Sequence, residues 1–125
     1  MLLELSSGWT TEVERGPDWL FIKLVAPPDL DLSALPLADA VWDLMQNHLI
    51  RRIVLEMDPR ILLQTELLNQ LVRLQLRIRS DGGLLRLCGL SEQNRQVLKI
   101  VRLDELLPQY ESREAALMRR PIRPR

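Results

Sequence analysis

The alternation of strand-like and helix-like segments along the chain constrains its fold more than any other feature. Short segments rich in β-forming residues at 10–14, 19–25, 51–57 and 84–90 predict strands, and residues 102–110 predict a short strand or turn. Segments of helical periodicity fall at 33–49, 65–79, 91–101 and 112–120. Strands that alternate with helices form a parallel or mixed sheet covered by those helices. The sequence therefore predicts an α/β fold with a mixed, mainly parallel sheet and about four helices.

Turn and capping residues support these boundaries. Gly16-Pro17-Asp18 separates the first two strands and predicts an N-terminal β-hairpin. Ser33, Ser91 and Ser112 each precede a helical segment and can cap it. The helix that begins near residue 65 is expected to stop at Ser80-Asp81-Gly82-Gly83, because glycine suits the left-handed position that follows a helix.

Composition describes one domain without a strong electrostatic preference. The chain has 125 residues, 46% of them apolar, which is enough for the core of one domain. Its 17 basic and 17 acidic side chains give no global attraction to nucleic acid or anionic lipid. The one basic run, at 119–125, contains two prolines and is predicted to be a flexible tail. We therefore expect no nucleic-acid partner.

The residues that usually carry chemistry are scarce. Cys88 is the single cysteine and lies in an apolar strand, so it is predicted to be a core residue in a reducing compartment. His48 is the single histidine and is expected on the surface near a helix end, which leaves no metal site and no catalytic triad. Without a phosphate-binding loop, a signal peptide or a membrane-spanning segment, the sequence favours a cytoplasmic protein that is not an enzyme and has no cofactor.

A polar triplet, Gln64-Thr65-Glu66, stands between an apolar run and the helix over 65–79. One interpretation is a helix cap supplied by the Thr65 hydroxyl. The other is a cap that is also a phosphorylation site, since the amide groups and dipole of a helix N-terminus tolerate phosphate. The residues alone leave both interpretations open.

From residue 53 onward the order of features resembles the STAS domain (sulfate transporter and anti-sigma factor antagonist). The resemblance rests on IVLEM at 53–57 and on the helix, glycine turn, strand and capped helix that follow, with SDGGLLRLCGLS at 80–91 as its most specific part. Upstream, IKLVAPPDLD at 22–31 resembles the second strand of that family and its acidic loop. The similarity covers roughly 10–118 and is greatest with the free-standing bacterial anti-sigma factor antagonists.

The resemblance implies a regulatory function. In that family an Asp-Ser-Ser-Gly-type motif opens this helix, and its first hydroxyl residue is phosphorylated by a serine/threonine kinase that is often the anti-sigma factor itself. Thr65 takes that position here, with Gln64 in place of the acid, Glu66 in place of the second hydroxyl, and Leu67 and Asn69 in place of glycines. The partner surface implied by the resemblance consists of Asp29, Asp31, Gln64, Glu66, Asn69 and Ser91.

Two forms of this function follow from the resemblance. The first is an anti-sigma factor antagonist-like protein, a monomer or weak dimer, that binds a kinase-type partner and is switched at Thr65. The alternative is a constitutive STAS-type subunit of a transport or signalling complex, which the altered motif suits. Three tryptophans are candidate anchors for a partner: Trp19 is expected in the core, Trp42 partly exposed, and Trp9 either at a sheet edge or in a dimer contact.

Overall fold

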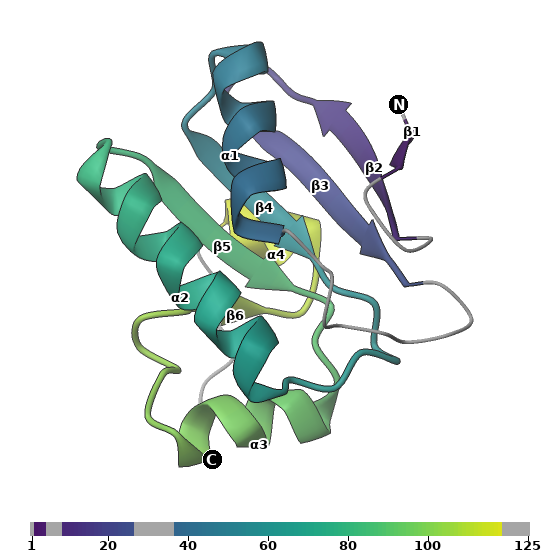
Figure 1. Cartoon of the computed structure of the whole chain (residues 1–125), viewed down its shortest axis with the longest axis vertical. Helices are drawn as coiled ribbons and strands as arrows, with labels where there is room; N and C mark the ends of the chain where they lie inside the picture. Colours follow the sequence, from purple (N-terminus) through teal and green to yellow (C-terminus); the bar gives the residue numbers. More distant parts are fainter. Residues whose placement is uncertain (1, 5–8, 27–36, 119–125) are drawn as a thin grey trace.

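The computed structural model describes residues 2–4, 9–26 and 37–118. Within these residues six strands form one sheet in the order β1-β2-β3-β4-β5-β6, accompanied by four helices (Figure 1). The strands are β1 (Leu2–Glu4), β2 (Thr10–Arg15), β3 (Leu20–Val25), β4 (Arg52–Glu56), β5 (Leu84–Cys88) and β6 (Gln109–Tyr110). The helices are α1 (Leu37–His48), α2 (Thr65–Ser80), α3 (Glu92–Ile100) and α4 (Arg113–Leu117).

The pairing of the strands confirms the predicted sheet. β2 pairs with β3 as an antiparallel hairpin, and β3, β4, β5 and β6 are parallel neighbours. β1 was not predicted; it adds a second antiparallel pair at the edge, with Leu2 opposite Glu12. A three-residue strand carries too few positions to show an alternating pattern, so only its pairing with β2 reveals it.

One face of the sheet forms the main core, beneath α1 and α2 (Figure 1). Because side chains alternate across a strand, every second residue of the central strands points to this face. The residues of β3, β4 and β5 that do so are Leu20, Ile22, Leu24, Ile53, Leu55, Leu85 and Leu87. Trp9, which directly precedes β2, is fully buried in the same core. Its side chain is therefore not available for a dimer contact in this fold.

α1 and α2 lie side by side and are joined by polar contacts as well as by the core. The Gln70 side chain of α2 accepts a hydrogen bond from the Ala38 amide at the start of α1, at 2.9 Å. Arg77 stacks on the Trp42 ring, 4.2 Å from its centroid, and forms an ion pair with Asp39. Trp42 is partly buried, as predicted. The expected cap at Ser33 lies outside the described residues.

α4 covers the opposite face of the sheet, over a smaller cluster. Val54, Cys88 and Tyr110 pack there against Ala116. Cys88 is therefore a buried core residue, as predicted. Trp19, which was expected in the core, is partly buried and packs against this second cluster, because it precedes β3 on the face that α4 occupies.

Helices α1, α2 and α3 are each followed, within two residues, by a residue with left-handed backbone geometry. These residues are Leu49 (φ 55°), Gly82 (φ 78°) and Arg102 (φ 60°). Gly82 occupies the position predicted for it, where a glycine meets no steric penalty. His48 is the last residue of α1 and is partly exposed, in line with the prediction of a surface histidine at a helix end.

Candidate functional site

The site predicted from the sequence lies at the carboxyl end of the parallel strands, where two loops pack together. The loop at 57–64 leaves β4 toward α2, and the loop at 89–91 leaves β5 toward α3. The Met57 amide donates to the Cys88 carbonyl at 2.9 Å. Gly89 has a φ of 76°, and a Cβ at this position would lie 2.9 Å from the Met57 carbonyl oxygen. The glycine therefore permits the close approach of the two loops.

Asp58 and Arg60 fasten the start of the first loop to the end of β3. The Asp58 carboxylate accepts hydrogen bonds from the Ala26 amide at 3.4 Å and from the Arg60 amide and guanidinium. Arg60 also donates to the Ala26 carbonyl at 3.0 Å. The hydrogen bond from the Arg60 side chain is the main reason that the pKa of Asp58 lies well below its ordinary value, at about 2. We call this pair the Asp58–Arg60 clasp.

Asn94 fastens the other end of the same loop to α3. Its side chain is buried, accepts a hydrogen bond from the Leu63 amide at 3.0 Å and donates one to the Ile61 carbonyl. These two partners determine which end of the amide points to which residue. The Asn94 backbone amide donates to the Ser91 hydroxyl at 3.2 Å, which confirms the predicted cap of α3. Ser91 and the loop before α2 are thus connected through one residue, which we call the Asn94 clamp.

The polar triplet differs from its predicted arrangement in one respect. Gln64, and not Thr65, is the N-cap of α2, and its side chain forms no capping hydrogen bond. Thr65 was predicted to cap the helix, but the first helical bond runs from the Leu68 amide to the Gln64 carbonyl, so Thr65 is already a helical residue. A residue with helical geometry cannot cap in the usual way, because an N-cap residue has an extended backbone.

Thr65 and its neighbours are nonetheless accessible. Gln64, Thr65 and Glu66 are all exposed, and Asn69 is exposed one turn further along the same side of α2. Leu62, just before the triplet, is 48% exposed although Ile61 and Leu63 on either side are buried. The sequence analysis missed Leu62, and its place inside an apolar run gives no signal that it points outward. The predicted residues Asp29 and Asp31 lie outside the described residues.

This arrangement places the apolar side chain of Leu62 on a loop that is held at both ends, and the hydroxyl of Thr65 in the first turn of the helix that follows it. The first amide groups of an α-helix have no partner within the helix, so the start of α2 can accept an anionic group. The described part of the chain contains no group of three His, Cys, Asp or Glu side chains that could hold a metal ion. Within that same part, no helix has the length and apolar character needed to cross a membrane.

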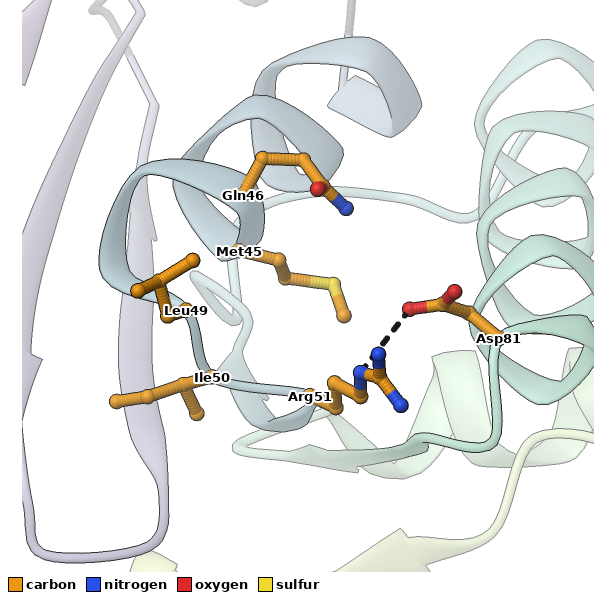
Figure 2. A pocket seen from close by; sticks show the side chains of 6 residues that line it. All are labelled: Met45, Gln46, Leu49, Ile50, Arg51 and Asp81. Atoms are coloured by element: carbon orange, nitrogen blue, oxygen red, sulfur yellow. Dashed lines mark ion pairs between the residues drawn. The ribbon is translucent and has the colours of Figure 1, made fainter.

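A hollow lies at the opposite, amino-terminal end of the parallel strands, where α1 leads into β4 and α2 leads toward β5 (Figure 2). Its volume is about 200 Å³, and its lining residues are Met45, Gln46, Leu49, Ile50, Arg51 and Asp81. Arg51 and Asp81 form an ion pair across it, at 3.4 Å. The sequence analysis did not find this hollow, because its walls come from two turns that are about 30 residues apart in the chain.

Comparison with known proteins supports the fold. The NMR structure of the protein TM1081 matches with a TM-score of 0.70 and 20% sequence identity, over 85% of this chain and 84% of that one. No protein-family model matches the sequence. A search of curated proteins also found no match. At this level of identity the structural likeness establishes a shared α/β fold.

Proposed function

We propose that the chain is an anti-sigma factor antagonist-like regulatory protein of the STAS type. It binds a serine/threonine kinase-type anti-sigma factor, or a related signalling protein, through the surface around the start of α2. Phosphorylation of Thr65 controls that binding. The resemblance of the sequence to STAS domains suggests this function, and the mixed sheet with its N-terminal hairpin is compatible with it.

The observation that carries the proposal is the exposure of Thr65 in the first turn of α2, directly after a firmly held loop. The Thr65 side chain is accessible in the first turn of α2, so a kinase can reach its hydroxyl. The Asp58–Arg60 clasp and the Asn94 clamp hold the preceding residues at both ends. A fixed loop presents the same surface to each partner molecule, which lowers the entropy lost on binding.

The polarity and charge of the surface indicate which form of the protein, unphosphorylated or phosphorylated, binds the partner. The unmodified surface combines exposed Leu62 with the neutral side chains of Gln64 and Thr65, and one negative charge on Glu66. A phosphoryl group would add roughly −1.5 to −2 charges beside Glu66. Repulsion and the cost of desolvating that charge would oppose the close packing of a partner around Leu62. The unphosphorylated form is therefore the binding form.

A second form of the function is a constitutive interaction subunit. Leu67 is buried, and it stands where the family motif has a glycine. Its burial packs the first turn of α2 onto the core, which suits a surface that stays in one conformation. In this form Thr65 contributes to the interface as an ordinary polar residue, and the complex does not respond to phosphate.

A pull-down from a lysate of the source organism tests both forms. The baits are the wild type, Thr65→Glu and the size-matched neutral variant Thr65→Gln, with captured proteins identified by mass spectrometry. A kinase-type ATPase retained by the wild type and by Thr65→Gln, and lost by Thr65→Glu, supports the switch. A protein retained equally by all three baits supports the constitutive subunit. If no bait retains a specific protein, both forms are contradicted.

Transfer of phosphate gives an independent test of the switch. The captured ATPase is incubated with labelled ATP and either the wild type or Thr65→Val. The chain has two other threonines, Thr10 and Thr11, and the second of these is buried in the sheet. Label on the wild type that is absent from Thr65→Val assigns the site. Equal labelling of both proteins would refute the role of Thr65.

A further inference from the structure

α4 is attached to the sheet by a small apolar contact. α1 and α2 bury five residues each, whereas Ala116 is the one buried residue of α4. Ala115 is partly buried against the same cluster, and Leu117 and Met118, at the end of the helix, are 42% and 60% exposed. Two alanine side chains cover little apolar area, so burial contributes little to the docking of α4. A helix of five residues is also too short to be stable by itself.

The start of α4 is held by ion pairs that reach the solvent. Arg113, its first residue, donates to the Glu56 carboxylate at 3.0 Å and to the Glu14 carboxylate at 2.9 Å. Its guanidinium also lies over the Phe21 ring, 5.5 Å from the centroid. The Glu14 side chain is 70% exposed, and an ion pair with so much access to water contributes little to stability.

The end of α4 is held by a guanidinium that is costly to bury. The Arg86 side chain on β5 donates to the Ala116 carbonyl and lies over the rings of Trp19 and Tyr110. Arg86 is buried, and it forms no ion pair with any residue in the described part of the chain. Burial of a charged group without an opposite charge is unfavourable. Removal of α4 would hydrate this guanidinium, which lowers the net cost of the removal.

We infer that α4 is a cover that opens from the second cluster as a unit, while the sheet and the other three helices stay folded. Elements with few buried contacts open at a lower free energy than the core of the same protein. Opening exposes Val54 and Tyr110 and breaks the contacts of the two arginines. It leaves the Asn94 clamp intact, because the Ile61 and Leu63 side chains beside the clamp belong to the main core.

The open form presents a surface that the closed form hides. Trp19, Tyr110 and the Arg86 guanidinium would all gain access to water. Because the ion pairs of Arg113 reach the solvent, added salt screens them and favours the open form. The closed form predominates, so a brief alkylation of the folded protein still finds Cys88 covered. The inference does not depend on the proposed function.

Native-state hydrogen exchange, followed by NMR on the nitrogen-15-labelled protein, tests the inference. The Ala116 amide, which donates to the Ser112 carbonyl, reports the opening of α4. The amide of Leu74, a fully buried residue of α2, reports unfolding of the whole domain. After correction for intrinsic rates, Ala116 should exchange about 100-fold faster than Leu74 or more. Its rate should rise only slightly with urea below the unfolding transition, because the opening of α4 exposes little surface.

Three variants separate local opening from global unfolding. Asn94→Ala breaks the clamp in the closed and the open form alike, so it should accelerate exchange at Leu74 and leave Ala116 unchanged. Arg113→Gln weakens the closed form, so Ala116 should exchange about fivefold faster than in the wild type. Arg73→Gln makes the same substitution at an exposed position of α2 and is the matched control, which should leave Ala116 unchanged.

Equal exchange rates or equal urea slopes at Ala116 and Leu74 would show that α4 leaves the sheet only when the whole domain unfolds, and would overturn the inference. So would an Asn94→Ala protein in which both amides accelerate equally, or an Arg113→Gln protein in which Ala116 exchanges as in the wild type. An Ala116 amide without any protection in the wild type would show that α4 is not docked, which also contradicts the inference. If Asn94→Ala does not fold, the urea slopes of the wild type decide.

Discussion

Replacing Asn94 with alanine should destabilise the protein more than replacing a residue that only caps a helix. The substitution removes the acceptor for the Leu63 amide and the donor for the Ile61 carbonyl, and both of these residues are buried. Each buried polar group that loses its partner costs about 1–3 kcal/mol. Two such groups, together with the small cavity, give a loss of about 3 kcal/mol in the free energy of unfolding. That is a large part of the roughly 5–15 kcal/mol that stabilises an ordinary domain.

Urea denaturation of Asn94→Ala and Ser91→Ala measures this effect. Ser91→Ala removes the hydroxyl that caps the same helix, which should cost about 1 kcal/mol, and leaves the loop before α2 intact. The two variants should therefore differ by about 2 kcal/mol at an unchanged denaturant slope. In addition, hydrogen exchange of the Leu63 amide should accelerate in Asn94→Ala alone. Equal losses in the two variants, or an unprotected Leu63 amide in the wild type, would refute the role assigned to Asn94.

Three further predictions concern residues at the carboxyl end of β4 and β5. The pKa of Asp58 is lowered to about 2 in the folded protein, so its ionised carboxylate contributes to the free energy of unfolding above the pKa of the unfolded chain, and this contribution is lost as the pH falls through about 2. Urea curves at a series of pH values should show the free energy of unfolding fall by about 1 kcal/mol below about pH 4, and the Asp58→Asn variant should not show this fall. The expected loss is small because Arg60 is exposed to solvent. Burial in the second cluster, followed by the charge of Glu56, raises the pKa of the Cys88 thiol to about 12, so iodoacetamide should modify Cys88 at about pH 8.5 only after urea unfolds the protein, as mass spectrometry can detect. Gly89→Ala should cost about 1–3 kcal/mol, measured by the urea midpoint, since its Cβ would lie 2.9 Å from the Met57 carbonyl and its φ is 76°; a midpoint equal to the wild type would contradict the close approach of the two loops.

Local sequence signals predicted most of the fold because the elements follow their own periodicity and caps. Ser91 and Ser112 cap the helices they precede, and Gly82 ends α2 as expected. β1 escaped detection because its three residues become a strand only through pairing with β2. Leu49 was read as one more apolar position of a helix, since periodicity carries no information on where the left-handed residue falls.

The sequence predicted where the candidate site lies in the chain, but it did not predict the contacts that hold the loop before α2. The triplet lies at the start of α2, where the sequence analysis expected a helix to begin, except that Gln64 and not Thr65 is the N-cap. Asn94 stands three residues after the Ser91 cap, and that spacing gives no sign that its side chain holds a loop about 30 residues away in the chain. Asp58 stands next to Pro59 just after β4, and that position gives no sign of its contact with Ala26. Contacts between residues so distant in sequence leave no periodic signal in either segment.

The two fastenings of the loop before α2 also have a consequence for the order of folding. The Asp58–Arg60 clasp joins residues 32 and 34 positions apart, and the Asn94 clamp spans 31 and 33 positions. Contacts that close such long segments tend to form after local helices and hairpins, because the loss of chain entropy precedes the gain from the contact. We therefore expect α2 to be native-like in the transition state while the residues before it are still unfastened. Loss of the clamp should then accelerate unfolding and leave the refolding rate nearly unchanged.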